Sequence, residues 1–269
     1  MITSPVNPGI KRVIRLRDKA KEREKENAFV TEGVKLFCEA PSHLLMSVYY
    51  CRALLRDEDE KKVKARIDEL KKDVSCRAVF EETDKEVFLK MCDTKTPQGV
   101  MCIVSIPSYD EDTIFNKENG LYLISEGIRD PGNMGTVIRT AESAGVTAVI
   151  LIKGSADPYQ PKCIRSTMGS IYRLPVIYME DTDTLLSLLK KKGITSYASS
   201  PAAKNSFYEE DFRGKTAFWV GNEALGLSES ALNGAEKKIL IPMEGSAESL
   251  NAAVSAGLLM YEALRQRKM

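Results

Sequence analysis

The sequence predicts an α/β protein with a small amino-terminal α/β domain and a larger carboxyl-terminal domain, whose mainly parallel sheet has helices on both faces. Six short segments in the carboxyl-terminal half are apolar without alternation, as strands buried on both faces are. Helical segments separate most of them, as the crossovers of a parallel sheet require. The chain has 269 residues, 43% of them hydrophobic and 29% charged, which is enough for one large and one small soluble domain.

Residues 1–106 are expected to form the smaller domain, in which helices and strands alternate. A basic helix comes first, and Thr31 is expected to cap the short helix that follows it. Strands are expected at 44–51, 74–80 and 99–106, and helices at 57–72 and 83–92. The acidic, turn-rich stretch 107–120 has no period and is expected to be a linker.

Residues 121–269 are expected to form the larger domain. Its strands are expected at 121–125, 146–152, 174–179, 194–199, 216–221 and 237–243. Its helices include 135–145, 183–193 and 249–268.

The composition excludes several kinds of site. His43 is the only histidine, so a histidine-based triad or a multi-histidine metal site is not expected. The six cysteines are irregularly spaced without a CxxC pair, which indicates free thiols in a reducing compartment. No signal-peptide core and no run of about 18 apolar residues is present, so we expect a cytoplasmic protein without a membrane partner. The net charge of +1 gives no global sign of nucleic-acid binding, but residues 11–25 form a basic patch.

Three loops rich in glycine and small polar residues follow predicted strands: SEGIRDPGNMG (125–135), GNEALGLSE (221–229) and IPMEGSAESLN (241–251). Ligands of open parallel sheets bind at the carboxyl ends of the strands, so these loops are expected to form one site. The GxGxxG fingerprint of dinucleotide-binding proteins and the P-loop pattern are both absent. Phosphate is therefore not the group that these loops are expected to bind.

The segments NMGTVIRTAESAG, GNEALGLS and IPMEGSAESLNAAVSAGLLMYE resemble, in this order, the three motifs of the SpoU (TrmH-like) RNA 2'-O-ribose methyltransferases of the knotted SPOUT class. The segments NPGIKRVIRLRDKAKEREKENAFVTEGVKL and TKTPQGVMCIV resemble the RNA substrate-binding domain, of the ribosomal L30 type, that often precedes that catalytic domain. The resemblance implies S-adenosylmethionine as cofactor, a carboxyl-terminal trefoil knot that binds it, and a homodimer formed with help from the terminal helix.

The resemblance also implies which residues hold the cofactor. Gly221 of the second motif and Ile241, Met243, Leu250 and Asn251 of the third match positions that bracket the adenosine and the methionine moiety. Gly221 could also be needed only for its backbone conformation, whether or not it contacts the cofactor.

The catalytic positions implied by the resemblance are Arg139, Asn133, Glu223, Ser249 and Asn251. Arg139 matches the first-motif arginine that lies over the substrate ribose, in some arrangements reaching from a partner subunit. Guanidinium groups stay protonated and are poor bases, so we favour a role in orienting the 2'-hydroxyl and its phosphate over proton removal. Ser249 is also a natural helix N-cap, and Glu223 could be a simple loop carboxylate.

Arg12, Arg15 and Lys19 of the basic patch are candidate phosphate contacts. The predicted substrate is structured RNA, with 23S ribosomal RNA first and transfer RNA second. A non-catalytic RNA-binding or ribosome-assembly protein with the same fold is the alternative from another class. Base methylation by another knotted branch is a second alternative, against which the first-motif Arg139 argues.

Overall fold

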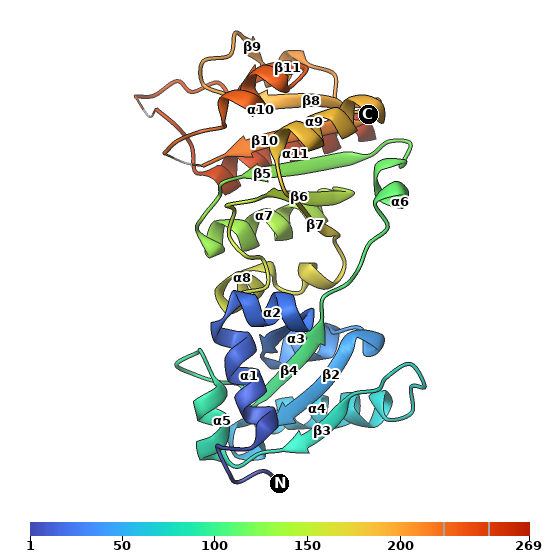
Figure 1. Ribbon diagram of the computed structural model, residues 1–269, viewed down its shortest axis with the longest axis vertical. Coiled ribbons are helices and arrows are strands. Elements are labelled where there is room, and N and C mark those ends of the chain that lie inside the picture. Colours follow the sequence, from blue (N-terminus) through green and yellow to red (C-terminus); the bar gives the residue numbers. More distant parts are fainter. Residues whose placement is uncertain (223, 247) are drawn as a thin grey trace. The chain divides into compact units, whose positions relative to one another are not determined.

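A computed structural model describes residues 1–222, 224–246 and 248–269. Contacts divide the chain into two compact units, one of residues 1–108 with 159–172 and one of residues 109–158 with 173–269. Each unit has its own sheet and its own helices (Figure 1). The predicted fold class, a small α/β domain beside a larger domain with a parallel sheet, is confirmed. The trefoil knot and the L30 likeness stay predictions.

The first unit has a four-stranded sheet in the order β1-β4-β2-β3. β4 is antiparallel to both neighbours, whereas the edge strand β3 is parallel to β2. The strands are β1 (Ala28–Glu32), β2 (Leu45–Tyr50), β3 (Val79–Glu82) and β4 (Val100–Ser105). The helices are α1 (Pro8–Asp18), α2 (Ala20–Glu26), α3 (Val34–Glu39), α4 (Asp57–Leu70), α5 (Lys85–Met91) and α8 (Pro161–Thr167).

Two expectations for this unit are wrong. Thr31 does not cap a helix, because it lies in β1 opposite Cys102 of β4, and Gly33 precedes the first residue of α3 instead. Gly33 has a φ of +115°, a conformation that glycine adopts freely and that lets the chain leave the strand. The strand expected over 74–80 begins only at Val79, since pairing with β2 spans Val79 to Glu82.

The stretch 159–172 falls in the range predicted for the larger domain, yet it packs with the first unit. The rings of Tyr159 and Tyr172 lie 5.0 and 6.4 Å from that of Phe29. The Tyr172 hydroxyl donates to the carbonyl of Leu36 at 3.1 Å. Contacts so distant in sequence leave no local signal, which is why the sequence pattern did not predict them.

The second unit has seven strands in the order β7-β6-β5-β10-β8-β11-β9, and every neighbouring pair is parallel (Figure 1). The strands are β5 (Leu121–Glu126), β6 (Ala148–Ile152), β7 (Val176–Met179), β8 (Thr195–Ser199), β9 (Asn205–Ser206), β10 (Thr216–Gly221) and β11 (Lys237–Leu240). The helices are α6 (Glu111–Phe115), α7 (Pro131–Ser143), α9 (Thr182–Lys191), α10 (Glu229–Gly234) and α11 (Ala252–Lys268). All six strands expected from the sequence are present.

Helices cover both faces of this sheet. On one face, Ile124 of β5 and Trp219 of β10 belong to a buried cluster with Leu185 of α9 and Ala231 of α10. On the other face, α7 and α11 pack against each other, and α11 contacts β10. An added Cβ on Gly257 would make an ordinary van der Waals contact, at 3.6 Å, with the Thr140 side chain, so α7 and α11 lie side by side at this position.

The stretch 107–120, expected to be an irregular linker, contains α6. Asp110 caps this helix by accepting from the backbone N–H of Thr113, and Ile114 and Phe115 are buried in the cluster of the second unit. The Tyr122 hydroxyl donates to the carbonyl of Ile114 at 2.8 Å. Within the described ranges, no helix is both long and apolar enough to span a lipid bilayer.

Candidate active site

A cavity of about 330 Å³ lies at the carboxyl ends of β8, β10 and β11. These strands are neighbours in the parallel sheet, so the loops that follow them meet at one edge, as the sequence predicted for two of them. The lining residues are 199–201, 220–222, 224–226, 241, 243, 248–250, 252 and 255.

The loop after β10 is a tight turn that needs a glycine at its start. Asn222 and Gly226 exchange two backbone hydrogen bonds, of 3.1 and 2.8 Å. A Cβ on Gly221 would lie only 2.3 to 2.5 Å from the backbone of Gly226 and Leu227. The Asn222 carboxamide oxygen accepts from the backbone N–H groups of Ala224 and Leu225, at 2.9 and 3.0 Å. The turn therefore keeps its backbone against the cavity.

The loop after β5, which leads into the first motif, is held beside this turn. The Asn222 carboxamide nitrogen donates to the carbonyl of Gly127 at 2.9 Å. From the other side, the Ser155 hydroxyl accepts from the backbone N–H of Gly127 and donates to the carbonyl of Ser125, both at 3.0 Å. The start of the loop that leads into the first motif is thus anchored beside the turn, and this loop does not line the cavity.

Glu126, the last residue of β5, joins three elements, and the sequence reasoning missed it. One carboxylate oxygen accepts from the hydroxyls of Thr182 and Ser228, at 2.6 and 2.8 Å. The other oxygen accepts from the backbone N–H of Ser228 at 2.8 Å. Ser228 in turn caps α10, so Glu126 anchors the far end of the turn after β10. A carboxylate at the end of an apolar strand, directly before Gly127, was the available signal.

The first and third motifs meet through an amide pair. The Asn251 carboxamide nitrogen donates to the carboxamide oxygen of Asn133 at 3.1 Å. Asn251 is also the N-cap of α11, because its oxygen accepts from the backbone N–H groups of Ala253 and Val254, at 2.9 and 3.4 Å. Ser249, which the sequence offered as an N-cap, lies instead in the loop that lines the cavity.

Arg139 lies on the exposed side of α7. Its guanidinium makes no hydrogen bond or ion pair with the part of the chain that the structure describes, and it does not line the cavity of its own chain. This side chain is therefore available to a ligand.

The basic patch has a different character. Arg12 donates to the Glu26 carboxylate at 2.6 Å, and Arg15 lies 3.4 Å from Glu22. Arg23 is buried and donates to the carbonyl of Leu16 at the end of α1, which fixes the corner between α1 and α2. Lys19, at that corner, is exposed.

Burial makes three of the cysteines poor nucleophiles near neutral pH. All six are free thiols, as expected. Burial raises the pKa of the Cys92 thiol to about 12 and raises the pKa values of Cys38 and Cys51 as well, so these thiols stay protonated near neutral pH.

Comparisons with known proteins agree with this geometry. A family model described as the SpoU rRNA Methylase family matches residues 120–261, which include every loop of the cavity after β8, β10 and β11. The chain belongs to the SpoU rRNA methylase family. A second model, the MRM3-like substrate binding domain, matches residues 7–102. The family predicted from the three motifs is confirmed.

Relatives and solved structures of SpoU methylases cover nearly the whole chain. The 23S rRNA (guanosine(2553)-2'-O)-methyltransferase RlmP of Bacillus subtilis (strain 168) is 32% identical over 260 residues, 97% of this chain and 97% of that protein. An AdoMet-bound rRNA methyltransferase from Sinorhizobium meliloti superposes with a TM-score of 0.85 at 28% identity, covering 98% of this chain and 97% of that one. The SpoU methyltransferase AviRb from Streptomyces viridochromogenes, in complex with AdoMet, also gives 0.85, at 25% identity and coverages of 97% and 98%.

The structure sorts the residues proposed for this SpoU methylase into three groups. The residues that line the cavity are Gly221, Ile241, Met243, Ser249 and Leu250. The residues that lie outside its lining are Asn133, Asn251 and Arg139. Glu223 lies outside the described residues. The sequence reasoning missed the cavity wall at 199–201, for which the only signal was a Ser-Ser-Pro run at the end of a predicted strand.

Proposed function

We propose that this protein transfers a methyl group from S-adenosylmethionine to the 2'-hydroxyl of a ribose in 23S ribosomal RNA. The observation that carries the proposal is the cavity that the second and third SpoU motifs build at the ends of β8, β10 and β11. The match to RlmP over 97% of both chains supports ribosomal RNA in preference to transfer RNA.

The cavity fits an adenosine better than a phosphate-bearing ligand. Glu248 is the only ionisable side chain among the described residues that line it, so no cation there would bind a phosphate. Ile241, Met243 and Leu250 offer apolar surface for a base, and the turn that Gly221 starts offers backbone donors and acceptors. When bound, S-adenosylmethionine supplies the electrophilic methyl group.

Arg139 is proposed to orient the acceptor. Its five N–H donors can form a fork to the ribose 2'-hydroxyl and the adjacent phosphate, which aligns the oxygen for in-line attack. The guanidinium keeps its proton near neutral pH, so it cannot accept the proton of the hydroxyl. That proton is transferred to the substrate phosphate or to water. Asn133 and Asn251 are proposed to hold the start of α7 against the third-motif loop.

We also propose that the protein is a homodimer formed through the face that carries α7 and α11. Val254, Leu258 and Tyr261 are 50%, 39% and 49% exposed, and their spacing places them on one side of α11. Tyr208 beside them is 65% exposed. A partner on this apolar stripe would bring its own Arg139 toward the cavity, which this chain's Arg139 does not line.

We propose that residues 1–106 form the domain that recognises the RNA. Residues 107–120 join it to the methyltransferase domain, residues 121–269. Lys19 is the strongest candidate phosphate contact, since its ammonium has no ion pair among the described residues. Arg15 and Arg12 follow, because glutamates already engage them.

The test is methyl transfer from tritium-labelled S-adenosylmethionine to 23S rRNA and to transfer RNA from cells that lack this protein. Nuclease digestion then identifies the labelled nucleoside. A 2'-O-methylnucleoside from 23S rRNA is expected. Label in transfer RNA or on a base would overturn the substrate or the reaction, and cofactor binding without transfer to any RNA would favour a non-catalytic RNA-binding protein.

A further inference from the structure

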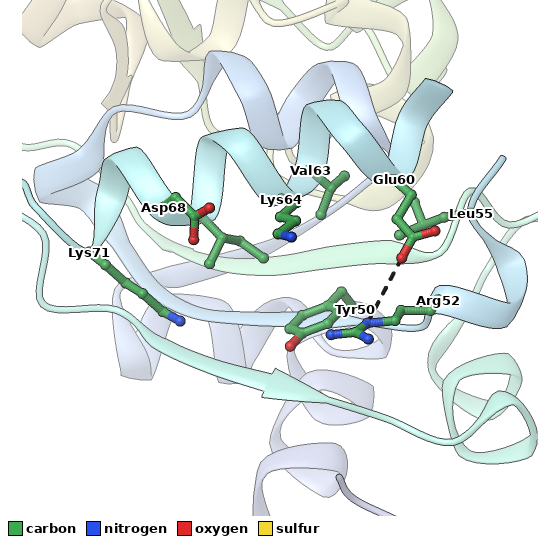
Figure 2. A pocket seen from close by; sticks show the side chains of 9 residues that line it. Tyr50, Arg52, Leu55, Glu60, Val63, Lys64, Asp68 and Lys71 are labelled. Atoms are coloured by element: carbon green, nitrogen blue, oxygen red, sulfur yellow. Dashed lines mark ion pairs between the residues drawn. The ribbon is translucent and has the colours of Figure 1, made fainter. Parts of the chain in front are cut away.

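A second cavity, of about 270 Å³, lies in the first unit between α4 and the end of β2. We call it the Tyr50 groove. Figure 2 shows the Tyr50 ring beneath α4, with Arg52 and Glu60 toward one end and Lys71 toward the other. Its lining residues are Tyr50, Arg52, Leu55, Glu60, Val63, Lys64, Ile67, Asp68 and Lys71.

The fold exposes one ring to this groove. Successive side chains of a strand point to opposite faces, so Tyr49 and Tyr50 point apart. Tyr49 is buried against α1, in a cluster with Ile10 and Val13. Tyr50 is only half-buried, and its hydroxyl makes no hydrogen bond to any residue that the structure describes. The groove therefore presents an aromatic ring with an unused polar end.

Apolar and cationic groups surround this ring. Val63 and Ile67 of α4 are buried and form an apolar wall with Leu55. Lys64 and Lys71 lie on the same side, two turns or about 10 Å apart. Neither has an ion pair with a described residue, although the Lys71 ammonium lies 5.9 Å from the centre of the Phe80 ring.

The carboxylates of the groove do not neutralise the charge of Lys64 or Lys71 by an ion pair. Glu60 lies 4.0 Å from the Arg52 guanidinium (Figure 2). Glu82 approaches the same guanidinium to 3.5 Å. Asp68 is then the only carboxylate lining the groove that makes no ion pair with a described residue. A carboxylate beside an aromatic ring can accept from the amino or imino groups of a base.

We propose that the Tyr50 groove holds one unpaired nucleotide of the RNA substrate. Proteins read single-stranded RNA by stacking exposed bases on aromatic side chains while cations contact the backbone, and Tyr50, Lys64 and Lys71 supply these groups. The volume is below the roughly 300–1,000 Å³ of whole small-molecule sites, which suits one base better than a complete cofactor. This inference rests on the proposed function, because it concerns the same RNA.

The test compares two double variants of the full-length protein that remove equal charge from one region of the chain. K64A/K71A empties the groove of its free cations. K61A/K72A is the matched control, since both of its lysines are exposed, lie outside the groove and have no ion pair with a described residue. Affinity for transcribed 23S rRNA is measured by filter binding over a series of salt concentrations.

K64A/K71A is expected to bind the RNA about tenfold more weakly than the control, and its slope of log affinity against log salt is expected to be smaller by about 2. Tyr50→Ala is expected to weaken binding at least about fivefold, and Tyr50→Phe, which keeps the stacking ring, by much less. Ultraviolet crosslinking of the wild-type complex should attach RNA to the peptide that contains Tyr50.

Equal affinities and equal salt slopes for K64A/K71A and K61A/K72A would overturn the inference, even if the wild-type protein methylates 23S rRNA. Failure of the proposed function looks different, because the wild-type protein would then transfer no methyl group to RNA. In that case, weaker RNA binding by K64A/K71A than by its control would still support the groove.

Discussion

Two helices, α1 and α7, each carry an arginine, but one of these side chains is ion-paired and the other is exposed without an ion pair to a described residue. On α1, the Arg12 side chain is only 28% exposed and donates to Glu26 of α2 at 2.6 Å. On α7, Arg139 is exposed and has no ion pair with any described residue. In the sequence, Arg12 lies among eight basic residues and looks like part of a nucleic-acid surface, whereas Arg139 is a lone cation among small and apolar neighbours.

The difference teaches that a basic run does not by itself identify the cations that bind a ligand. In the run 11–25, glutamates follow the arginines closely enough to pair with them across the α1–α2 corner. Arg139 forms no ion pair with a described residue, and Glu142, three residues further along α7, accepts from Arg173 at 2.9 Å instead. An unpaired guanidinium on a well-packed helix is the better candidate for RNA contact during catalysis.

Removing Arg139 is expected to have the largest effect on the reaction. Arg139→Ala should lower kcat about 100- to 1,000-fold, the usual loss when one preorganised charge is removed from a transition state. The affinity for S-adenosylmethionine, measured by calorimetry, should change little, because Arg139 is proposed to hold the RNA ribose and phosphate and not the cofactor.

Arg139→Lys is the matched control, since it keeps the charge but loses the forked donors. Its kcat should lie between those of the wild type and Arg139→Ala. Near-normal turnover by the alanine variant would contradict the proposed role, because Arg139 would then matter no more to the reaction than the ion-paired Arg12.

Gly221→Ala is expected to weaken cofactor binding. The added methyl group would lie 2.3 to 2.5 Å from backbone atoms of Gly226 and Leu227, so the turn after β10 must shift. Overpacking of about 1–3 kcal/mol corresponds to roughly a five- to 150-fold weaker Kd for S-adenosylmethionine. Gly245→Ala in the next loop is the control, because open space surrounds that position. Equal Kd values for the two variants would contradict the proposed position of the cofactor.

Substitutions of Asn251 test whether α11 holds the start of α7, and so Arg139, in position. Asn251→Ala removes the cap and the hydrogen bond to Asn133, and should lower the free energy of unfolding by about 1 kcal/mol in urea denaturation. Asn251→Asp keeps the capping oxygen and replaces the donor to Asn133 with a carboxylate oxygen, which cannot donate to it. It should therefore retain stability while its kcat falls. Full activity of the aspartate variant would show that the hydrogen bond between Asn251 and Asn133 is not needed for catalysis.

Arg12→Ala is expected to have the smallest effect. Its ion pair with Glu26 is partly exposed, so the free energy of unfolding should fall by at most about 1 kcal/mol. RNA affinity should fall less than in Lys19→Ala, because the Lys19 ammonium is free for a phosphate. A larger loss of RNA affinity in Arg12→Ala would mean that the pair with Glu26 opens when RNA binds.

The sequence by itself determined six of the seven strands of the parallel sheet, most of the helices and the family, but not the two-residue edge strand β9. These depend on local features: uninterrupted apolar runs for buried strands, a capping residue such as Asp181 for a helix, and motif positions for the family. Gly221 and the loops after β10 and β11 could be predicted for the same reason, since they directly follow recognisable strands.

Only the tertiary structure decided which side chains meet. Asn133 and Asn251 are 118 residues apart, and Glu126 reaches Ser228 across 102 residues. Thr31 lies in a strand because β4 pairs with it, and residues 199–201 line the cavity because β8 lies between β10 and β11. Local propensity carries no information about such partners, because packing between distant segments decides which hydrogen bonds and strand pairings form.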